Sequence, residues 1–347
     1  MPCCLEVTSV QVDEEAIRTC PDDELSDLVD KLWGKYKFQP KPESPTGGLL
    51  VHFMEKRISP NYTSRLVWSA PRPHFLIDFK AAVDLARSLG IRTPPIERFH
   101  RIFTQGRYYY LIISRYIPGI SLEKLLPRID REETIRLAFQ LRSMLETMHQ
   151  KTSRYAGGIG TLAFDRGGRF MNWDEIGLPK GSTTAKDIAN VANYRWGYRR
   201  ETHGDCRETP EKMEWDIKNG PLAPNLPLVF THYGLVPRRL IRNNNGDLWI
   251  TEWDNAGWYP ACFDRASMIG GIFRKDRMAR QEWELFRSIA NGYKWSREVK
   301  AINRINNCTR SCCDNRENCA RLGLTKLEYP IIIEEWPADP RVRYGPV

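Results

Sequence analysis

Residues 228–260 have the sequence LVFTHYGLVPRRLIRNNNGDLWITEWDNAGWYP, and this stretch decides the fold of the chain. Short strands are expected at 228–230, 239–241 and 248–250, and the last two flank an Asn-Asn-Asn-Gly turn. Asn and Gly tolerate the positive φ angles that a tight hairpin turn needs. We therefore expect a hairpin that brings the loop at 232–239 and the acidic residues at 252–254 to the same end of a small sheet. Polar groups from distant positions would then converge on one cleft.

The composition limits the class of protein. The 347 residues suffice for one large or two small domains. Hydrophobic residues make up 41% and charged residues 27%, as in a soluble protein with a real core. No apolar run approaches the length of about 18 residues that a transmembrane helix needs. The first twenty residues lack the basic and apolar segments of a secretory signal, so we expect a cytoplasmic protein whose nine cysteines are reduced.

Basic residues exceed acidic residues by nine, with 52 Lys and Arg against 43 Asp and Glu. Such an excess suits an RNA partner or an acidic ligand, and it also occurs on ordinary soluble surfaces. Residues 194–200 interleave aromatic residues with arginines, which is typical of phosphate pairing and base stacking and also of amphipathic packing. The arginines that we expect to hold a substrate or RNA are Arg195, Arg199, Arg200, Arg238, Arg239 and Arg242.

Apolar spacing and turn residues predict the secondary structure outward from this stretch. Helices are expected at 22–36, at 75–89 before Gly90, at 131–149 with Asp130 as the N-cap, at 264–273 and at 281–293. Strands are expected within 51–68, at 108–116 and at 327–336, with loops at 40–48 and in the polar segment 165–227.

Two groups of possible metal ligands have spacings that match no common zinc pattern. One lies within the polar segment and the other in the C-terminal tail. We expect no bound metal and no cofactor, although a metal at the tail cysteines stays an alternative. The groups are His203, Asp205 and Cys206, and Cys308, Cys312, Cys313 and Cys319.

The stretch at 228–260 resembles the catalytic core of the aminoglycoside phosphotransferase and choline kinase family, most closely its fungal members. Those proteins carry HGDLHPRN, a hairpin and IDWExAGWYP, where this chain has HYGLVPRR at 232–239 and TEWDNAGWYP at 251–260. The segments 91–95 and 117–122 are similar to the family's IPVP turn and YIPGxxL hinge. The resemblance implies an α+β, protein-kinase-like bilobal fold, with a small β-rich N-lobe and a larger, mainly helical C-lobe.

The resemblance also implies domain boundaries, because it extends from about residue 50 to about residue 290. We expect an N-terminal helix and linker, an N-lobe, a C-lobe with an insertion, and a cysteine-containing tail. Their ranges are 1–48, 49–118, 119–300 with the insertion at 165–227, and 301–347.

The family's chemistry is not preserved in this chain. The catalytic aspartate falls on Gly234, the metal-binding asparagine on Arg239 and the second metal-binding aspartate on Glu252. The position of the family's N-lobe glutamate falls on or near Lys80, and a lysine there would repel an ATP-binding lysine. The strand at 65–70 supplies no such ATP-binding lysine. Phosphoryl transfer needs metal ions and a carboxylate that orients the nucleophile. We therefore expect no ordinary ATP-dependent kinase activity.

Two acidic residues, Glu252 and Asp254, survive at the altered site. They are able to hold a cation or, as we favour, to pair with Arg238 or Arg239, because an arginine in a cleft needs a carboxylate partner. His232 follows the family's own histidine, which supports the loop.

The lost phosphotransfer site and the basic patches make the chain similar to the fungal arginine-containing cyclodipeptide synthases, cytosolic proteins of about this size that use aminoacyl-tRNA. This resemblance implies aminoacyl-tRNA as a partner and an amino acid or another small molecule as substrate. Glu252 or Asp254 would bind an arginyl guanidinium or act as general base, and His232 or Tyr233 would carry protons. The alternatives are a pseudokinase that binds a partner or nucleotide, and a small-molecule phosphotransferase with relocated catalytic groups.

Overall fold

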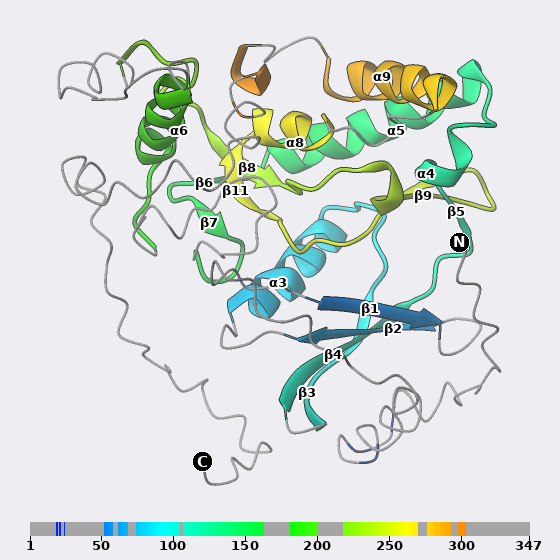
Figure 1. Ribbon diagram of the computed structural model, residues 1–347. Coiled ribbons are helices and arrows are strands. Elements are labelled where there is room, and N and C mark those ends of the chain that lie inside the picture. The colour runs from blue at the N-terminus through cyan, green and yellow to red at the C-terminus, as the bar shows by residue number, and fades with distance from the viewer. Residues whose placement is uncertain are drawn as a thin grey trace, which may run out of the picture.

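A computed structural model describes most of the two expected lobes. It covers Thr19, Pro21, Glu24, residues 52–57, 62–68, 74–104, 107–162, 181–199, 218–269, 276–292 and 297–300, and Ile302. The chain has the expected α+β bilobal architecture, with a β-sheet lobe below and a mainly helical lobe above (Figure 1). Apart from Glu24, the expected elements at 22–36, 40–48 and 327–336 and the tail cysteines lie outside the described residues, and the domain boundaries stay predictions.

The small lobe is an antiparallel sheet in the order β1-β2-β4-β3, and helix α3 (His74–Ser88) lies between this sheet and the large lobe (Figure 1). The strand expected at 108–116 is confirmed as β4, whereas β3 lies in a segment where the sequence predicted no strand. The bounds are His52–Arg57 for β1, Tyr62–Trp68 for β2, Ile96–Thr104 for β3 and Arg107–Arg115 for β4.

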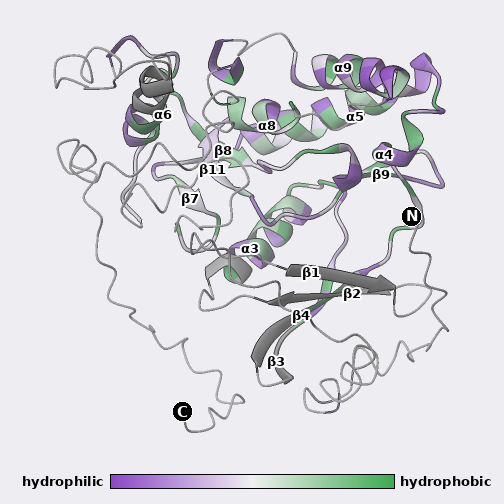
Figure 2. Ribbon diagram, viewed as in Figure 1, coloured by the Kyte–Doolittle hydropathy of each residue, from purple (hydrophilic) through white to green (hydrophobic). Residues whose placement is uncertain are grey.

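The large lobe is organised by helices α5 (Arg131–His149) and α9 (Arg277–Asn291), which pack together. Asp130 caps α5 as predicted, because its carboxylate accepts a hydrogen bond from the Glu133 backbone N–H at 2.8 Å. Figure 2 shows that hydrophobic and hydrophilic residues alternate around these helices. Shorter helices are α4 (Leu122–Leu125), α6 (Ala185–Arg199) and α8 (Cys262–Ser267). No helix among the described residues is long and apolar enough to cross a membrane.

Two small sheets carry the stretch at 228–260. The predicted hairpin is confirmed, since β9 (Leu240–Asn243) pairs antiparallel with β10 (Leu248–Ile250). β9 also pairs with β5 (Gly119–Ser121), and the short helix η2 (Pro237–Arg239) precedes it. The other sheet has the order β6-β8-β11-β7, with β6 at Thr152–Ser153, β7 at Gly157–Gly158, β8 at Leu228–Thr231 and β11 at Gly257–Pro260.

The segment 165–227 is not only the polar loop that its composition predicted. Helix α6 forms within it and buries one face against α8 and β8 in a second hydrophobic cluster. The buried residues of α6 recur at the spacing of one helix face, and the polar residues between them concealed this pattern. They are Ile188, Ala189, Val191, Ala192 and the polar Asn193.

Helix α3 is attached to the large lobe by a buried carboxylate. Asp78 accepts hydrogen bonds from the backbone N–H groups of Gly160 and Thr161, both at 2.7 Å, and from Thr161 Oγ1 at 2.8 Å. Gly158 leaves room for this contact, because a Cβ atom there would overlap the Asp78 carboxylate. The buried side chains of α3 also belong to the same hydrophobic cluster as those of α5 and α9. Because that cluster also includes Ile112 of β4, it is the hydrogen bonds of Asp78 that attach the helix to the large lobe.

Candidate functional site

The loop after β8 is held in place by one fully buried carboxylate. Asp264 of α8 accepts hydrogen bonds from the backbone N–H groups of His232 at 2.9 Å and Tyr233 at 2.7 Å, both through Oδ1. Its Oδ2 lies 2.9 Å from His149 Nε2 on α5. Tyr233 has a φ of 48°, a left-handed conformation that bulky residues rarely adopt and that marks sites where the surrounding structure fixes the backbone.

Arg239 lies between the two surviving acids. Its Nε donates to Glu252 Oε2 and its Nη2 donates to Asp254 Oδ2, both at 2.7 Å. Nη1 lies 3.4 Å from the Gly234 carbonyl oxygen. The Arg239 side chain is only 5% exposed and that of Asp254 only 8%. Charge-assisted bonds of this length are strong, and the arrangement is the arginine–carboxylate pairing that we favoured from the sequence.

Gly234 and Arg239 depend on each other for space. A Cβ atom on Gly234 would overlap Arg239 Nη1 and would also lie 3.1 Å from Asn255 Nδ2. The glycine is therefore required by close approach to the guanidinium. An aspartate at position 234 does not fit beside Arg239.

The residues present do not fit the magnesium site that the resemblance implies. The guanidinium of Arg239 takes the place between the carboxylates of Glu252 and Asp254, where a cation would be held. Within the described part of the chain, no group of three or more His, Cys, Asp or Glu residues has the geometry to hold a metal ion. Arg239 thus provides a permanent positive charge between the two carboxylates.

His232 and Tyr233 are both buried in the protein interior. His232 Nε2 lies 3.0 Å from the Thr251 carbonyl oxygen. The His232 ring packs edge-on against the Trp253 ring, with 4.7 Å between the ring centroids. Burial, and then the nearby charge of Arg239, lower the pKa of His232 to about 4, so the ring is neutral at pH 7. Tyr233 packs against the ring of Phe263 at 5.1 Å. Their role as proton carriers stays a prediction, and this geometry favours the structural alternative.

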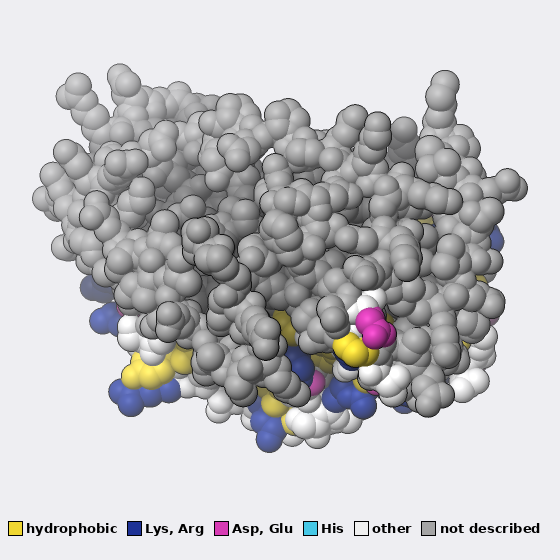
Figure 3. Space-filling view, turned by 90° about the horizontal axis from the view of Figure 1, so that it is seen from below, with side chains coloured by type: hydrophobic (Ala, Val, Ile, Leu, Met, Phe, Trp, Pro, Cys, Tyr) yellow, Lys and Arg dark blue, Asp and Glu magenta, His cyan; other side chains and the backbone are white. Residues whose placement is uncertain are grey.

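The remaining predicted arginines do not gather at one place. Arg238 is exposed on η2, and Arg242 Nε is paired with Glu133 Oε1 at 3.1 Å. Helix α6, which carries Arg195 and Arg199, lies at the other end of the large lobe from β9 (Figure 1). The side chains of these two residues, and Arg200, lie outside the described residues. On the face seen in Figure 3, Lys and Arg side chains project along one edge among hydrophobic ones. RNA binding by these residues stays a prediction, and the burial of Arg239 weighs against its own part in it.

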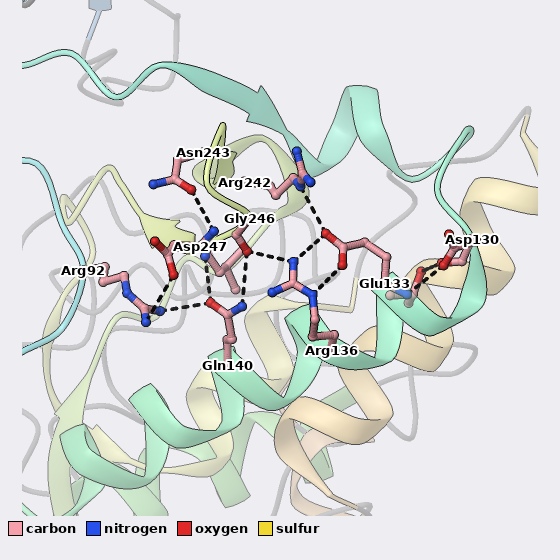
Figure 4. A network of polar contacts seen from close by, with 11 residues as sticks. Arg92, Asp130, Glu133, Arg136, Gln140, Arg242, Asn243, Gly246 and Asp247 are labelled. Atoms are coloured by element: carbon pink, nitrogen blue, oxygen red, sulfur yellow. Dashed lines mark hydrogen bonds and ion pairs between the residues drawn. The ribbon is translucent and has the colours of Figure 1, made fainter.

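The hairpin turn is fixed to α5 by a polar network that the sequence did not reveal (Figure 4). Arg136 Nη2 and Gln140 Nε2 donate to the Gly246 carbonyl oxygen at 2.8 and 3.2 Å. Glu133 bridges Arg136 and Arg242, and the hydrogen bond from Arg136 holds the pKa of Glu133 below its usual value. These residues lie on the polar face of α5, where the sequence alone indicates a solvated surface.

The expected role of Lys80 is wrong. Its side chain is 48% exposed, and its Nζ pairs with Asp84 Oδ2 at 2.5 Å one turn along α3. Lys80 therefore cannot repel a lysine inside the site. The buried charge of α3 is Asp78, two residues earlier, and the signal for it was a single acid within an otherwise apolar helix face.

A cavity of about 170 Å³ lies between the lobes, next to the Arg239 cluster. Helix α3, strand β4 and the residues after it, and the segments 238–241 and 251–253 form its walls. Its apolar surface comes from Phe79, Val83, Ile96, Ile112, Ile117 and Ile241, and its charged groups are Arg115, Arg238 and Glu252.

No protein-family model and no curated protein matches this sequence. Solved structures of aminoglycoside phosphotransferases are similar to it. The structure of APH(4)-Ia is 12% identical, covering 87% of this chain and 96% of that one, with a TM-score of 0.46. The GDP complex of aminoglycoside 2'-phosphotransferase-IIIa is 13% identical, covering 82% and 89%, with a TM-score of 0.48.

Proposed function

We propose that the chain binds a small organic molecule in the cavity between the lobes and does not transfer a phosphoryl group from magnesium-bound ATP. The observation that carries this proposal is Arg239, which bonds to both Glu252 and Asp254. Phosphoryl transfer requires a metal on the phosphates and a carboxylate near the nucleophile. In this chain the two carboxylates already have a cation, and Gly234 supplies no third one.

The pairing also makes Arg239 difficult to displace. A magnesium ion that took its place would leave a buried guanidinium without partners, and breaking a buried ion pair in this way costs roughly 3–5 kcal/mol. The metal would have to recover that cost from two carboxylates alone. The internal cation therefore supports a site that works without a metal.

The cavity has the composition of a small-molecule site. Such sites have mostly apolar walls with a few polar groups that orient the ligand. Here apolar side chains from both lobes face one acidic and two basic side chains. The volume of about 170 Å³ lies below the common range of roughly 300–1,000 Å³, so we expect a compact ligand of one or two rings.

Thermal stability with nucleotides tests the proposal. The melting temperature of the protein should respond equally to ATP with magnesium and to ATP with a chelator, and no phosphate should be transferred to an aminoglycoside or to water. Magnesium-dependent stabilisation by ATP together with phosphate transfer would overturn the proposal. The triple variant Gly234→Asp, Arg239→Asn, Glu252→Asp serves as the positive comparison, because it restores the family's residues and should gain magnesium binding.

A second candidate is aminoacyl transfer from aminoacyl-tRNA, which would form an arginine-containing cyclodipeptide. One observation favours it: Asp254 Oδ1 is buried and has no hydrogen-bond partner within the described part of the chain. That oxygen, or the Glu252 carboxylate on the cavity wall, would accept a proton from an α-amino group or bind an arginyl guanidinium. The amino nitrogen of one aminoacyl-tRNA would attack the ester carbonyl of a second, an amide would form, and the ribose hydroxyl of the second tRNA would leave with the proton. The free amino group of the resulting dipeptidyl ester would then attack its own ester carbonyl, which closes the ring with a second amide and releases the other ribose hydroxyl with the second proton.

This reaction needs no metal, because an aminoacyl ester is already activated. The test is to incubate the protein with amino acids, tRNA, ATP and synthetases, with and without ribonuclease, and to search for an arginine diketopiperazine by mass. A product that disappears with ribonuclease and with Asp254→Asn supports this candidate. Absence of product, with no tRNA binding at low salt, excludes it. Phosphate transfer to a small molecule would instead favour a phosphotransferase with relocated groups.

A further inference from the structure

The cavity between the lobes receives one arginine from each lobe. Arg115 is the last residue of β4, and Arg238 lies in η2 of the large lobe. Arg238 is exposed and forms no ion pair within the described part of the chain. Arg115 makes one long contact of 3.4 Å with Glu97, and its side chain is 55% exposed. Both guanidinium groups therefore have donors that face water or the cavity.

The acidic residue on the cavity wall, Glu252, is already paired with a cation. Glu252 also lines the cavity, but its Oε2 already accepts a charge-assisted bond from Arg239 at 2.7 Å. Asp254, the other acid of this cluster, does not line the cavity and bonds to the same guanidinium. The positive charges at the cavity are thus less fully compensated than the negative one.

Given the metal-free binding proposed above, on which this inference rests, we infer that the ligand is an amphipathic anion. Its apolar body would lie against walls such as Phe79 and Ile112, and its carboxylate or phosphate monoester would be held by Arg238, with Arg115 facing it. A planar guanidinium binds such oxyanions through two parallel hydrogen bonds and needs no metal to do so. The anion would then be bound by side chains, in contrast to metal-held phosphates.

Matched ligands that differ only in their head group test this inference by titration calorimetry. The probes are 4-phenylbutyrate, 3-phenylpropyl phosphate and the neutral 4-phenylbutyramide, each titrated without magnesium. Each acid should bind at least about tenfold more tightly than the amide, because hydrogen bonds to a charged group are stronger than those to a neutral one. Preference for one acid over the other identifies the head group as carboxylate or phosphate.

Three variants locate the head group. Arg238→Gln should remove the advantage of the acids over the amide, and Arg115→Gln should reduce it. Arg142→Gln is the matched control, because Arg142 is a half-exposed arginine with a single carboxylate partner, Glu146, and does not line the cavity. It should leave all three affinities unchanged. Arg238→Lys keeps the charge without the planar fork and should retain part of the advantage.

Equal binding of the acids and the amide would overturn the inference and leave metal-free binding intact. The same holds if Arg238→Gln still binds the acids more tightly than the amide. Failure of both acids to bind also overturns it. Binding that appears only for magnesium-bound ATP would overturn the proposed function as well, so the two failures are distinct. Circular dichroism of each variant shows whether a lost affinity reflects a lost fold.

Discussion

Two arginine–carboxylate clusters lie at opposite ends of the β9–β10 hairpin, and they differ in their access to water. The inner cluster joins Arg239 to Glu252 and Asp254, and its arginine is 5% exposed. The outer cluster joins Glu133 to Arg136 and Arg242, whose side chains are 45% and 35% exposed. The chemistry of the pairs is the same, and only the surroundings differ.

Burial decides what each cluster contributes. Exposed ion pairs contribute about 0–1 kcal/mol, because water solvates the separated charges nearly as well. Removal of one partner from a buried pair costs about 3–5 kcal/mol, because the other charge is left without solvent. Arg239 and Arg242 are three residues apart in the chain and belong to different regimes. The inner cluster therefore fixes the site, whereas the outer one only docks the hairpin turn.

The largest expected effect is that of Asp254→Ala. The substitution leaves Arg239 with one carboxylate in a nearly dry environment, and we expect the free energy of unfolding to fall by about 3–5 kcal/mol. Urea unfolding followed by tryptophan fluorescence measures the change. Asp254→Asn, which keeps the shape and one acceptor, should cost less. A loss below about 1 kcal/mol would place the inner cluster in the same class as the outer one.

The next effect is the pH dependence of stability that the inner region imposes through His232. Its pKa is lowered to about 4 in the folded protein, against about 6.5 in an unfolded chain. The unfolded state therefore binds the proton more tightly, and stability that is complete above pH 6.5 is lost as the pH falls through 4. The loss should reach about 3 kcal/mol.

Unfolding curves of the wild type and of His232→Asn between pH 7 and pH 4 isolate this contribution. The two proteins should differ in the slope of stability against pH in that window, with the steeper fall in the wild type. Equal slopes would mean that folding does not shift the pKa of His232.

Gly234→Ala comes third. Its Cβ would overlap Arg239, and overpacking of this kind costs about 1–3 kcal/mol. In an Arg239→Met background the same substitution should cost much less, and a double-mutant cycle measures the coupling. Gly90→Ala is the control, because Gly90 has a φ of 75° and open space around it, so its cost arises from backbone strain alone. A penalty at position 234 that does not depend on Arg239 would refute the pairing of these two residues.

The smallest effect is expected in the outer cluster. Glu133→Ala removes both of its ion pairs, yet we expect a loss of only about 1 kcal/mol or less, because the two remaining arginine side chains are 45% and 35% exposed and stay solvated. Added salt should reduce this loss further, whereas the effect of Asp254→Ala should change little with salt. A large, salt-independent loss at Glu133 would contradict the distinction between the clusters.

The sequence predicted local structure better than it predicted which side chains are buried. The hairpin, the Asp130 cap and the convergence of residues 232–239 with 252–254 follow from turn chemistry and side-chain periodicity, which act over a few residues. The choice of Asp78 over Lys80 as the inward group of α3 depends on rotation of the helix relative to the glycine turn at 157–161, which is a tertiary contact. Likewise, nothing near Arg239 in the sequence shows that it is buried and Arg242 is not.

The attachment of α3 has a consequence for how the protein opens. Asp78 bonds to the turn at Gly160 and Thr161, and Thr93, beyond the other end of the helix, accepts a hydrogen bond from the buried Trp253 at 2.8 Å. A helix anchored at both ends should unfold only together with its anchors. In hydrogen exchange, the backbone amides of α3 should therefore exchange at the rate of the slowest amides of α5, as one cooperative unit. Motion between the lobes would then take place between α3 and the sheet.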